Sequence, residues 1–365
     1  MRIVHIDTGR ELRGGQRQLL RLALGLRARG HEQLVVCPEG TALEERARAV
    51  GLRVFALPAQ DLGHANGIFQ LRQQLLSAPV DILHAHDGRG QTVSWLASWG
   101  LPVRRVASRR VTFLPGTRAR HRFIYARTCH AVIAVSEHIR GLLLETGVPP
   151  GRVEVIPDGI EIPAAALTAA QRHEARHAWG LEDPHFVVGQ LGAFTPEKGQ
   201  EVALKAIASL VERLPEIRLI LAGETTADFL SNFPMSMGAL RERVQFLGRL
   251  EDLSQFLAAI DLLIMPSRAE GLGSAALIGM AQGVPVVASR VGGLPEIVSD
   301  GENGWLVEPS SSQALAIAIA AAAADRERLK LYGQAARERA RQFSDVIMLQ
   351  RTEALYSRLL GSKLR

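Results

Sequence analysis

Cysteines, long apolar segments and an N-terminal signal sequence are scarce or missing in this chain, and each absence excludes a class of protein. Only Cys37 and Cys129 occur among 365 residues, so neither a disulfide framework nor a cysteine-based zinc cluster can form, and a reducing compartment is indicated. The longest wholly apolar run, residues 314–324, is rich in alanine and shorter than the roughly 20 residues that span a bilayer. The first residues, MRIVHIDTGRELRGG, contain acids and no apolar core. We therefore expect a folded, cytoplasmic protein without a membrane-crossing segment.

Acidic residues are missing from one long stretch. Between Asp87 and Glu137 there is no acid, although nine arginines fall there: Arg89, Arg104, Arg105, Arg109, Arg110, Arg118, Arg120, Arg122 and Arg127. This predicts a basic surface on the first half, suited to anionic lipid at the inner face of the cell membrane or to a phosphorylated substrate. A merely solvated basic face fits equally well. Nucleic acid is not an expected partner, because the sequence has no helix-turn-helix, zinc-finger or RNP-type pattern.

Short apolar runs alternate with helical patterns along the whole chain. The first half contains RIVHI, QLVVC, RVFAL, DILHA, RRVAS and AVIAV, and the second contains FVVGQL, RLILAG, VQFLG, DLLIMP, PVVAS and GWLVEP. Such runs predict two parallel sheets, since near-continuous apolar strands are typical of sheets covered by helices on both faces. A helix is expected over residues 16–29, and residues 157–175 are the best linker. We expect an α/β protein with two doubly wound domains facing across a cleft, and ligands at the carboxyl ends of the strands.

Gly14 and Gly15 lie in the loop after the first predicted strand, in TGRELRGGQRQ. Two glycines before a helix suit a phosphate or a close ligand approach, although a plain tight turn explains them as well. The spacing is not G-x-G-x-x-G, and no Walker A lysine follows. Neither hydride transfer nor P-loop phosphate hydrolysis is therefore predicted.

The second half carries the most specific pattern. LGAFTPEKGQEVALKAI sets Gly192 and Lys198 between a strand and a helix, where an ammonium suits a diphosphate. The later segment DLLIMPSRAEGLGSAALIGMAQGVPVVASRVGGLPEIVSDGENGWLV resembles the donor-binding segment of family 4 retaining glycosyltransferases, which have the GT-B fold. The matching positions are Pro266, Ser267, Glu270, Gly271, Gly273, Met280, Ala281, Gly283, Pro285, Gly292, Gly293, Pro295, Glu296, Asn303 and Gly304.

The resemblance covers nearly the whole chain, including GGQRQLLRLALGLRARGHE, DILHAHD, VEVIPDGIE and FSDVIMLQRTEALYSRLL. It implies an acceptor-side Rossmann-like domain over 1–162 plus a returning helix at 346–365, and a donor-binding domain over 163–345. It also implies a nucleotide-sugar donor and no metal or other cofactor.

In that resemblance Glu270 contacts hydroxyls of the donor sugar, and the amides of Gly271, Leu272 and Gly273 face its phosphates. Lys198, with the Gly14 and Gly15 loop, stabilises charge that grows on the leaving diphosphate. Lys198 and Glu270 are thus the expected catalytic residues. Taken by itself, a glutamate at a strand end is better interpreted as an acid that favours a helix dipole, and the surrounding motif run is what favours the functional role.

Two positions depart from the family pattern. The second acid of the family's E-x7-E pair falls on Ile278, which cannot accept a hydrogen bond from a ribose hydroxyl. The arginine that relatives often place before the Lys198 turn is Ala193. Losing one charged hydrogen bond to phosphate costs about 1.5–3 kcal/mol, which weakens donor binding without excluding it.

On the acceptor side the candidates are His86, Arg109 and Arg110. The resemblance places His86 at a cleft-facing strand end, and the two arginines stand where some relatives carry a histidine that touches the sugar. An arginine pair suits an anionic acceptor. His84, His86 and Asp87 are a weak metal-site pattern, because no third positioned ligand is evident. Glu137 and His138 open a helix and are interpreted as capping residues.

The leading expectation is transfer of a sugar, with retention, from a nucleotide diphosphate to a glycan or lipid-linked acceptor, in lipopolysaccharide or cell-surface polysaccharide assembly. A second hypothesis, favoured by Ile278, is a catalytically degenerate relative that serves as a binding partner in a glycosylation complex. An epimerase or phosphorylase on the same two-domain frame is disfavoured by the spacing of the motifs.

Overall fold

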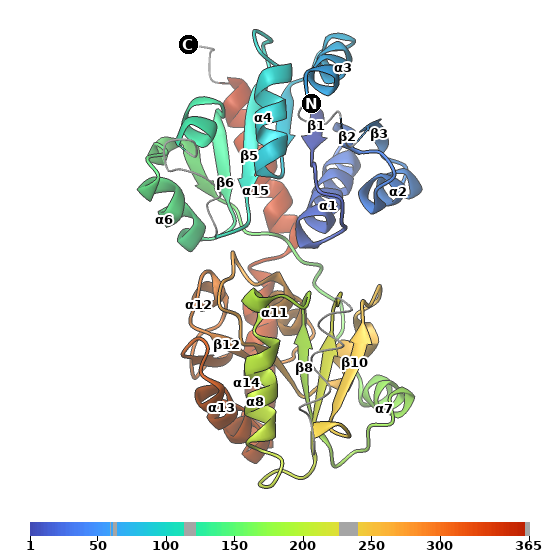
Figure 1. Ribbon diagram of the computed structural model, residues 1–365, viewed down its shortest axis with the longest axis vertical. Coiled ribbons are helices and arrows are strands. Elements are labelled where there is room, and N and C mark those ends of the chain that lie inside the picture. Colours follow the sequence, from blue (N-terminus) through green and yellow to red (C-terminus); the bar gives the residue numbers. More distant parts are fainter. Residues whose placement is uncertain (59, 61–63, 113–121, 226–239, 362–365) are drawn as a thin grey trace. The chain divides into compact units, whose positions relative to one another are not determined.

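The chain divides into two compact units. The computed structural model describes residues 1–58, 60, 64–112, 122–225 and 240–361 (Figure 1). Unit 1 consists of Met1–Gly159 and Asp345–Arg365, and unit 2 of Ile160–Ser344. The sequence predicted the divisions at 162/163 and 345/346, three residues and one residue later than in the structure. Each unit is a parallel sheet between helices, which confirms the predicted α/β class with two Rossmann-like domains.

Unit 1 is built on a seven-stranded sheet with the order β3-β2-β1-β4-β5-β6-β7. All adjacent pairs are parallel. The strands are β1 (Arg2–Ile6), β2 (Glu32–Pro38), β3 (Arg53–Leu57), β4 (Ile82–Ala85), β5 (Arg104–Arg109), β6 (Ala131–Ala134) and β7 (Val153–Val155). The six strands predicted for this half are present. β7 was not predicted, because three residues are too few to show a pattern.

Both faces of this sheet are buried, which explains why its strands are continuously apolar. Ile3 and Ile82 pack into a core with α1 (Gly14–Ala28) and α15 (Asp345–Gly361). Val4 and Leu83 point the other way, into a core with α3 (Ala65–Leu76) and α4 (Gly88–Ala97). Tyr356 of α15 is fully buried, so the last helix belongs to the core of unit 1, as the resemblance implied. The remaining helices of the unit are α2 (Ala42–Ala49), α6 (Glu137–Glu145), the π-helical η1 (Phe123–Arg127) and the short η2 (Pro150–Arg152).

Unit 2 is a six-stranded parallel sheet with the order β10-β9-β8-β11-β12-β13. Its strands are β8 (Phe186–Leu191), β9 (Ile217–Ala222), β10 (Val244–Gly248), β11 (Leu262–Met265), β12 (Val286–Ser289) and β13 (Gly304–Val307). Apolar residues of α8 (Gln200–Ala208) and α13 (Ser312–Ala324) share one core with the sheet. α10 packs on α7, and α11 packs on α14 and β11. The bounds are α7 (Ala169–Ala178), η3 (Pro196–Lys198), α10 (Ser254–Ala259), α11 (Ser274–Ala281), α12 (Leu294–Ile297) and α14 (Arg326–Arg341).

Each sheet has one point where the strand order reverses, between β1 and β4 in unit 1 and between β8 and β11 in unit 2. Ligands of doubly wound sheets bind beyond the carboxyl ends of the strands at such points. The loops after these four strands are therefore the places to search for a site. Among the described residues, no helix combines the length and the apolar character that crossing a bilayer requires.

Candidate functional site

The loops after β8 and β11 bring together the two residues expected to be catalytic in unit 2. Lys198 Nζ lies 2.6 Å from Glu270 Oε1, and the Ser267 hydroxyl donates to the same oxygen over 2.9 Å. The Glu270 side chain is 9% exposed and that of Lys198 is 29% exposed. The carboxylate is therefore held inside the edge of the unit while the ammonium reaches the surface.

Two glycines allow these loops to approach so closely. Gly292 has φ +57°, and a Cβ there would lie 1.8 Å from the backbone oxygen of Glu270. Gly199, which begins α8, has φ +67°, and its Cβ would lie 2.1 Å from the backbone oxygen of Pro266. Any other residue would have to push the Glu270 or Lys198 loop away, because the clashing atoms belong to backbone.

The Lys198–Glu270 pair leaves bonding capacity for a ligand. An ammonium has three donors, and within the described chain Lys198 uses one of them on Glu270. No described residue bonds Glu270 Oε2. α11 starts at Ser274 with Gly273 as its N-cap, so Gly271, Leu272 and Gly273 lead directly into the positive end of a helix. Such a site can hold an anion beside a group that has hydroxyls.

Two further donor-side predictions, Gly192 and Ile278, lie in unit 2, whereas the predicted donor residues Gly14 and Gly15 belong to unit 1. Gly192 follows β8, and a Cβ there would lie 3.5 Å from Lys198 Cδ. Ala193, which replaces an arginine of the family pattern, is half-buried, and its carbonyl accepts a hydrogen bond from Gln200 Nε2. Ile278 is half-buried on α11, one turn beyond Ser274, where it presents an apolar side chain.

In unit 1 the loops after β4, β5 and β7 meet at Arg110. Its Nε donates to Asp158 Oδ1 over 2.9 Å, and its Nη1 donates to His86 Nδ1 over 3.3 Å. The Arg110 side chain is 14% exposed and that of Asp158 is 8% exposed. A Cβ on Gly15 would lie 3.9 Å from Arg110 Cδ, so the cation lies against the first turn of α1. Gly14 and Gly15 are the first residues of α1 and do not precede it as expected.

Arg109, in contrast, bonds a residue that Arg110 is not seen to contact in the described part of the unit. It is buried, and its Nη1 donates to the hydroxyl of Tyr125 over 3.2 Å, with the guanidinium 5.8 Å from that ring's centroid. Successive residues of a strand point to opposite faces, which separates the two arginines. The two arginines predicted to act as a pair are thus separated, with Arg110 at the strand ends and Arg109 inside the unit.

Sequence reasoning missed two carboxylates of this edge. Asp7 follows β1 and is 1% exposed, and its Oδ1 accepts from Gly9 N and Gln16 Nε2. Burial, with a smaller contribution from Asp87, raises the pKa of Asp7. The other missed residue is Asp158, which stands where the family pattern V-I-P-N-G-I-D has asparagine. That substitution was the signal that could have found it.

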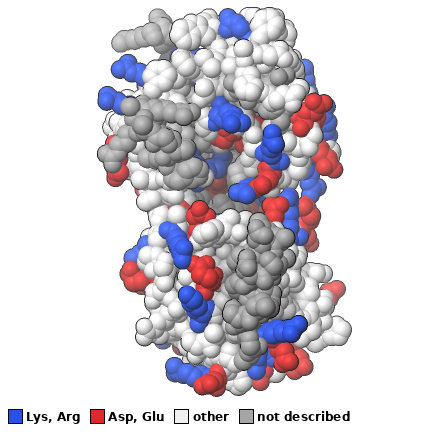
Figure 2. Space-filling view, viewed as in Figure 1, with Lys and Arg blue, Asp and Glu red and all other residues white. Residues whose placement is uncertain are grey.

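The basic surface predicted from the acid-free stretch is smaller than the sequence suggests. Arg104 and Arg109 are buried, Arg110 is paired with Asp158, and Arg105 donates to the Thr128 carbonyl. Arg89, Arg122 and Arg127 are exposed, whereas Arg118 and Arg120 lie outside the described residues. In Figure 2, Lys and Arg side chains of this unit are separated by uncharged surface in the part of the face that the picture describes.

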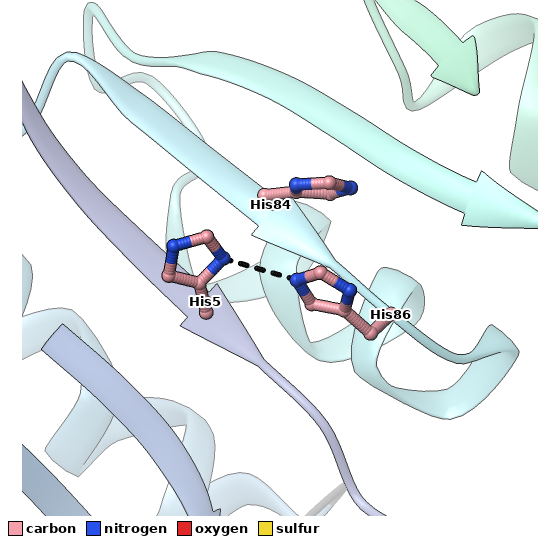
Figure 3. Close-up of side chains that lie close together, drawn as sticks. All are labelled: His5, His84 and His86. Carbon is pink, nitrogen blue, oxygen red and sulfur yellow. Dashed lines mark hydrogen bonds between the residues drawn. The ribbon is translucent and has the colours of Figure 1, made fainter. Parts of the chain in front are cut away.

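A third imidazole joins the two histidines found in the sequence, contrary to the expectation that no third ligand was positioned. His5 of β1, His84 of β4 and His86 just beyond β4 are buried, with their ligand nitrogens within 4.8 Å of one another (Figure 3). Burial lowers the pKa of His5 to about 4 and that of His84 and His86 well below the usual value. Asp87, the other residue of the metal pattern, instead caps α4 by accepting from Gly90 N. Burial thus favours the neutral form of all three rings.

The helix that Glu137 and His138 open is α6. Its N-cap is Ser136, whose hydroxyl accepts from Ile139 N, and Glu137 pairs with Arg140 over 3.3 Å. The capping side chain is thus the residue before the two that were expected to cap.

Two family models match the chain, one in each half. Residues 12–162 match the model described as Glycosyltransferase Family 4, and residues 171–339 match the model described as Glycosyl transferases group 1.

Curated relatives of similar sequence are bacterial. A D-inositol 3-phosphate glycosyltransferase of Corynebacterium aurimucosum is 28% identical over 347 residues, which is 86% of this chain and 82% of the relative. The protein of the same name from Mycobacterium marinum is 28% identical over 279 residues, 70% of this chain, and the match spans 58% of that relative's length.

Solved structures of similar fold cover almost the whole chain. HepE from Anabaena, crystallised with UDP-glucose, superimposes with a TM-score of 0.88 at 26% identity over 98% of this chain and 100% of that one. WaaG, a glycosyltransferase involved in lipopolysaccharide biosynthesis, gives a TM-score of 0.76 at 18% identity over 97% and 99% of the two chains.

Proposed function

We propose that this chain, a glycosyltransferase with the GT-B fold, moves a sugar from a nucleotide diphosphate to a hydroxyl of an anionic acceptor, with retention and without a metal ion. The observation that carries the donor half is the Lys198–Glu270 pair, in which the ammonium has unused donors and Glu270 Oε2 has no partner among the described residues. The named neighbour HepE is crystallised with UDP and with UDP-glucose, which supports a uridine nucleotide as the first donor to test.

The proposed chemistry divides the donor between these groups. Glu270 Oε2 accepts from sugar hydroxyls, while Lys198 and the first amides of α11 hold the diphosphate. The bond from the anomeric carbon to the phosphate oxygen breaks, and the acceptor oxygen bonds to that carbon on the same face. The departing phosphate oxygen takes the acceptor's proton. Positioning and stabilisation of the growing phosphate charge then supply the rate, and no protein nucleophile is needed.

The acceptor half rests on unit 1. Arg110 is a largely buried cation at the strand ends, and two of its five N–H groups bond Asp158 and His86. Relatives act on an inositol phosphate by name, which supports an acceptor that carries a phosphate or a similar anion. A lipid-linked or cell-surface glycan with such a group is the proposed natural acceptor, met at the anionic inner face of the cell membrane.

Binding of the donor is tested by thermal stabilisation with UDP, GDP, ADP and CMP, followed by hydrolysis of the matching nucleotide sugars. Lys198→Met should weaken nucleotide binding by about ten- to a hundredfold, the effect of losing a charged hydrogen bond. Arg268→Ala is the control, because Arg268 is a cation of the neighbouring segment that pairs with Glu201 at the surface. Equal losses in both variants would contradict the proposed role of Lys198.

Acceptor choice is tested with UDP-glucose and two matched compounds, D-inositol 3-phosphate and uncharged inositol. Transfer of glucose to D-inositol 3-phosphate but not to inositol would support an anionic acceptor. Equal transfer to the two compounds would contradict it. The same assay with a phosphate-bearing glycolipid in vesicles of anionic lipid distinguishes a lipid-linked acceptor from a water-soluble one. The anomeric configuration of the product, read by NMR, tests retention.

A second candidate is a binding partner that no longer turns over, and Ile278 is the observation that favours it. This side chain is apolar and half-buried where the family pattern has an acid. Binding of a nucleotide without hydrolysis or transfer for any sugar in a broad panel would favour this candidate over the enzyme.

A further inference from the structure

The three imidazoles of His5, His84 and His86 lie close enough together to suggest a metal site. The directions of their hydrogen bonds argue against a bound metal ion. His5 Nε2 lies 2.8 Å from Gln33 Oε1, and His5 Nδ1 lies 3.0 Å from His86 Nε2. His86 Nδ1 lies 3.3 Å from Arg110 Nη1. His84 stands apart from this chain, because its nitrogens face the hydroxyls of Tyr356 and Ser108.

The groups at the two ends of this row of hydrogen bonds fix the direction in which every member donates. An arginine can only donate, so His86 Nδ1 must accept. A neutral imidazole has one N–H, which for His86 is then on Nε2 and points to His5. His5 accepts on Nδ1 and donates from Nε2 to Gln33 Oε1. At the far end Gln33 Nε2 donates to the His31 carbonyl over 3.2 Å, which is the orientation of the amide that this direction requires.

The opposite direction fails at one contact. If Gln33 donated to His5, then His5 would donate to His86, and the remaining His86 N–H would face the N–H of Arg110. Two donors would then meet in a buried position, which costs the energy of an unsatisfied polar group. A metal ion bound by His5 Nδ1 and His86 Nε2 would force the same tautomer on His86 and create the same clash. Each hydrogen bond in this row is therefore donated in the direction from Arg110 to Gln33.

This row of hydrogen bonds holds Arg110, a largely buried cation at the strand ends of unit 1. Arg110 is fixed by Asp158 at Nε and by His86 at Nη1, and in the described part of the protein its other three N–H groups have no partner. Without an acceptor at His86 Nδ1, the guanidinium keeps a single anchor and is free to rotate about its pairing with Asp158.

We infer that Gln33 and His5 are positioning residues, which fix the tautomer of His86 and through it aim the open N–H groups of Arg110 at the anionic group of the acceptor. The inference rests on the proposed function for the acceptor, although the direction of the hydrogen bonds does not depend on it. Gln33 and His5 are 5% and 0% exposed, so they act through His86 and Arg110 and do not touch substrate.

The direction is tested in the full chain by NMR of ¹⁵N-labelled imidazoles. His5 and His86 should both be neutral with the proton on Nε2 at pH 7 and stay so at pH 5.5. A proton on Nδ1 of either ring, or a stoichiometric bound zinc ion with the ring protons displaced, would overturn the inference. This arm gives an answer even where no acceptor is found, so its failure is distinguishable from failure of the proposed function.

The consequence for binding is tested with Gln33→Met, which removes the final acceptor while keeping the size of the side chain. The Kd for D-inositol 3-phosphate, measured by calorimetry, should rise about tenfold, with the Kd for UDP unchanged. Gln33→Glu keeps an acceptor toward His5 and should restore most of the affinity.

The matched control is Tyr356→Phe. It removes a buried hydroxyl from His84 in the same cluster but leaves the chain from Arg110 to Gln33 intact. Its affinity for D-inositol 3-phosphate should be unchanged even if its Tm falls as far as that of Gln33→Met. Equal loss of affinity in the two variants would reduce Gln33 to a general packing role, and loss of UDP binding in Gln33→Met would do the same.

Discussion

The two units hold polar groups at the ends of their strands by different means. In unit 2 these groups are held by backbone contacts, because Gly199 and Gly292 allow the loops to pack closely around one charge pair. In unit 1 side chains hold these groups, through a hydrogen-bonded row from Gln33 to Asp158 that joins five separate strands or their ends. At this edge of unit 1 a Cβ on Gly14 would meet no atom within 4 Å, and a Cβ on Gly9 would meet side-chain atoms, 2.5 Å from Gln16 Nε2 and 2.9 Å from Asp7 Oδ1.

This difference predicts different sensitivities. A site built on backbone contacts tolerates no added Cβ at its contact glycines. A site built on side chains depends on protonation states and on partners far away in the sequence.

The largest expected effect comes from breaking the backbone contact of unit 2. Gly292→Val places a Cβ 1.8 Å from the Glu270 oxygen at φ +57° and should cost about 4 kcal/mol or more of unfolding free energy, with loss of UDP binding. Gly301→Val is the control, because Gly301 has φ +79° but no neighbouring atom closer than 4.0 Å. It should cost about 1–2 kcal/mol and retain UDP binding. Urea unfolding and calorimetry measure both, and similar costs would contradict the claim that contact, not conformation, requires Gly292.

Acid should break unit 1 at its imidazoles. Burial lowers the pKa of His5 to about 4 in the folded protein, below the unfolded value near 6.5. Between these two pH values the unfolded chain therefore binds a proton that the folded chain does not. The contribution of His5 to stability is complete above pH 6.5 and is lost as the pH falls toward 4, by about 3 kcal/mol in total.

The variant His5→Gln isolates this contribution. Between pH 7 and pH 4.5 the wild type should lose about 2–3 kcal/mol more unfolding free energy than His5→Gln, as measured by urea unfolding. His173→Gln removes an exposed imidazole of α7 in unit 2 and should leave the pH slope of the wild type unchanged. A wild-type slope in His5→Gln would mean that His5 is protonated in the folded protein.

How much could be predicted from the sequence follows from the same contrast. All strands of both sheets except β7 were predicted, because apolar runs buried on both faces are visible locally. The Lys198 and Glu270 loops stood out because their glycines and charges form contiguous motifs. The role of Arg110 depends on Asp158, 48 residues away, and on His5, 81 residues before His86. No local pattern records such pairings.

The departures from the family pattern carry information only when combined. Arg109 and Arg110 stand where the resemblance places a histidine of some relatives, and Asp158 stands where the pattern has asparagine. Each looks like an isolated exchange in the sequence, but the structure joins Arg110 and Asp158 in one ion pair over 2.9 Å. Ile278 has no such compensating partner among the charged residues described around α11. It is therefore the departure whose reversal is most informative.

The smallest expected effect is a gain. Ile278→Glu restores a carboxylate one turn beyond Ser274 on α11, and a new hydrogen bond to a ribose hydroxyl should tighten UDP binding about fivefold, or about 1 kcal/mol. Ile278→Met keeps the site apolar and should leave the Kd for UDP unchanged, which separates the effect of the acid from that of reshaping a half-buried position. If Ile278→Glu does not tighten binding while Lys198→Met still weakens it, the diphosphate lies as proposed but the ribose does not reach this turn. The natural donor would then be one whose nucleoside is held by other residues of unit 2.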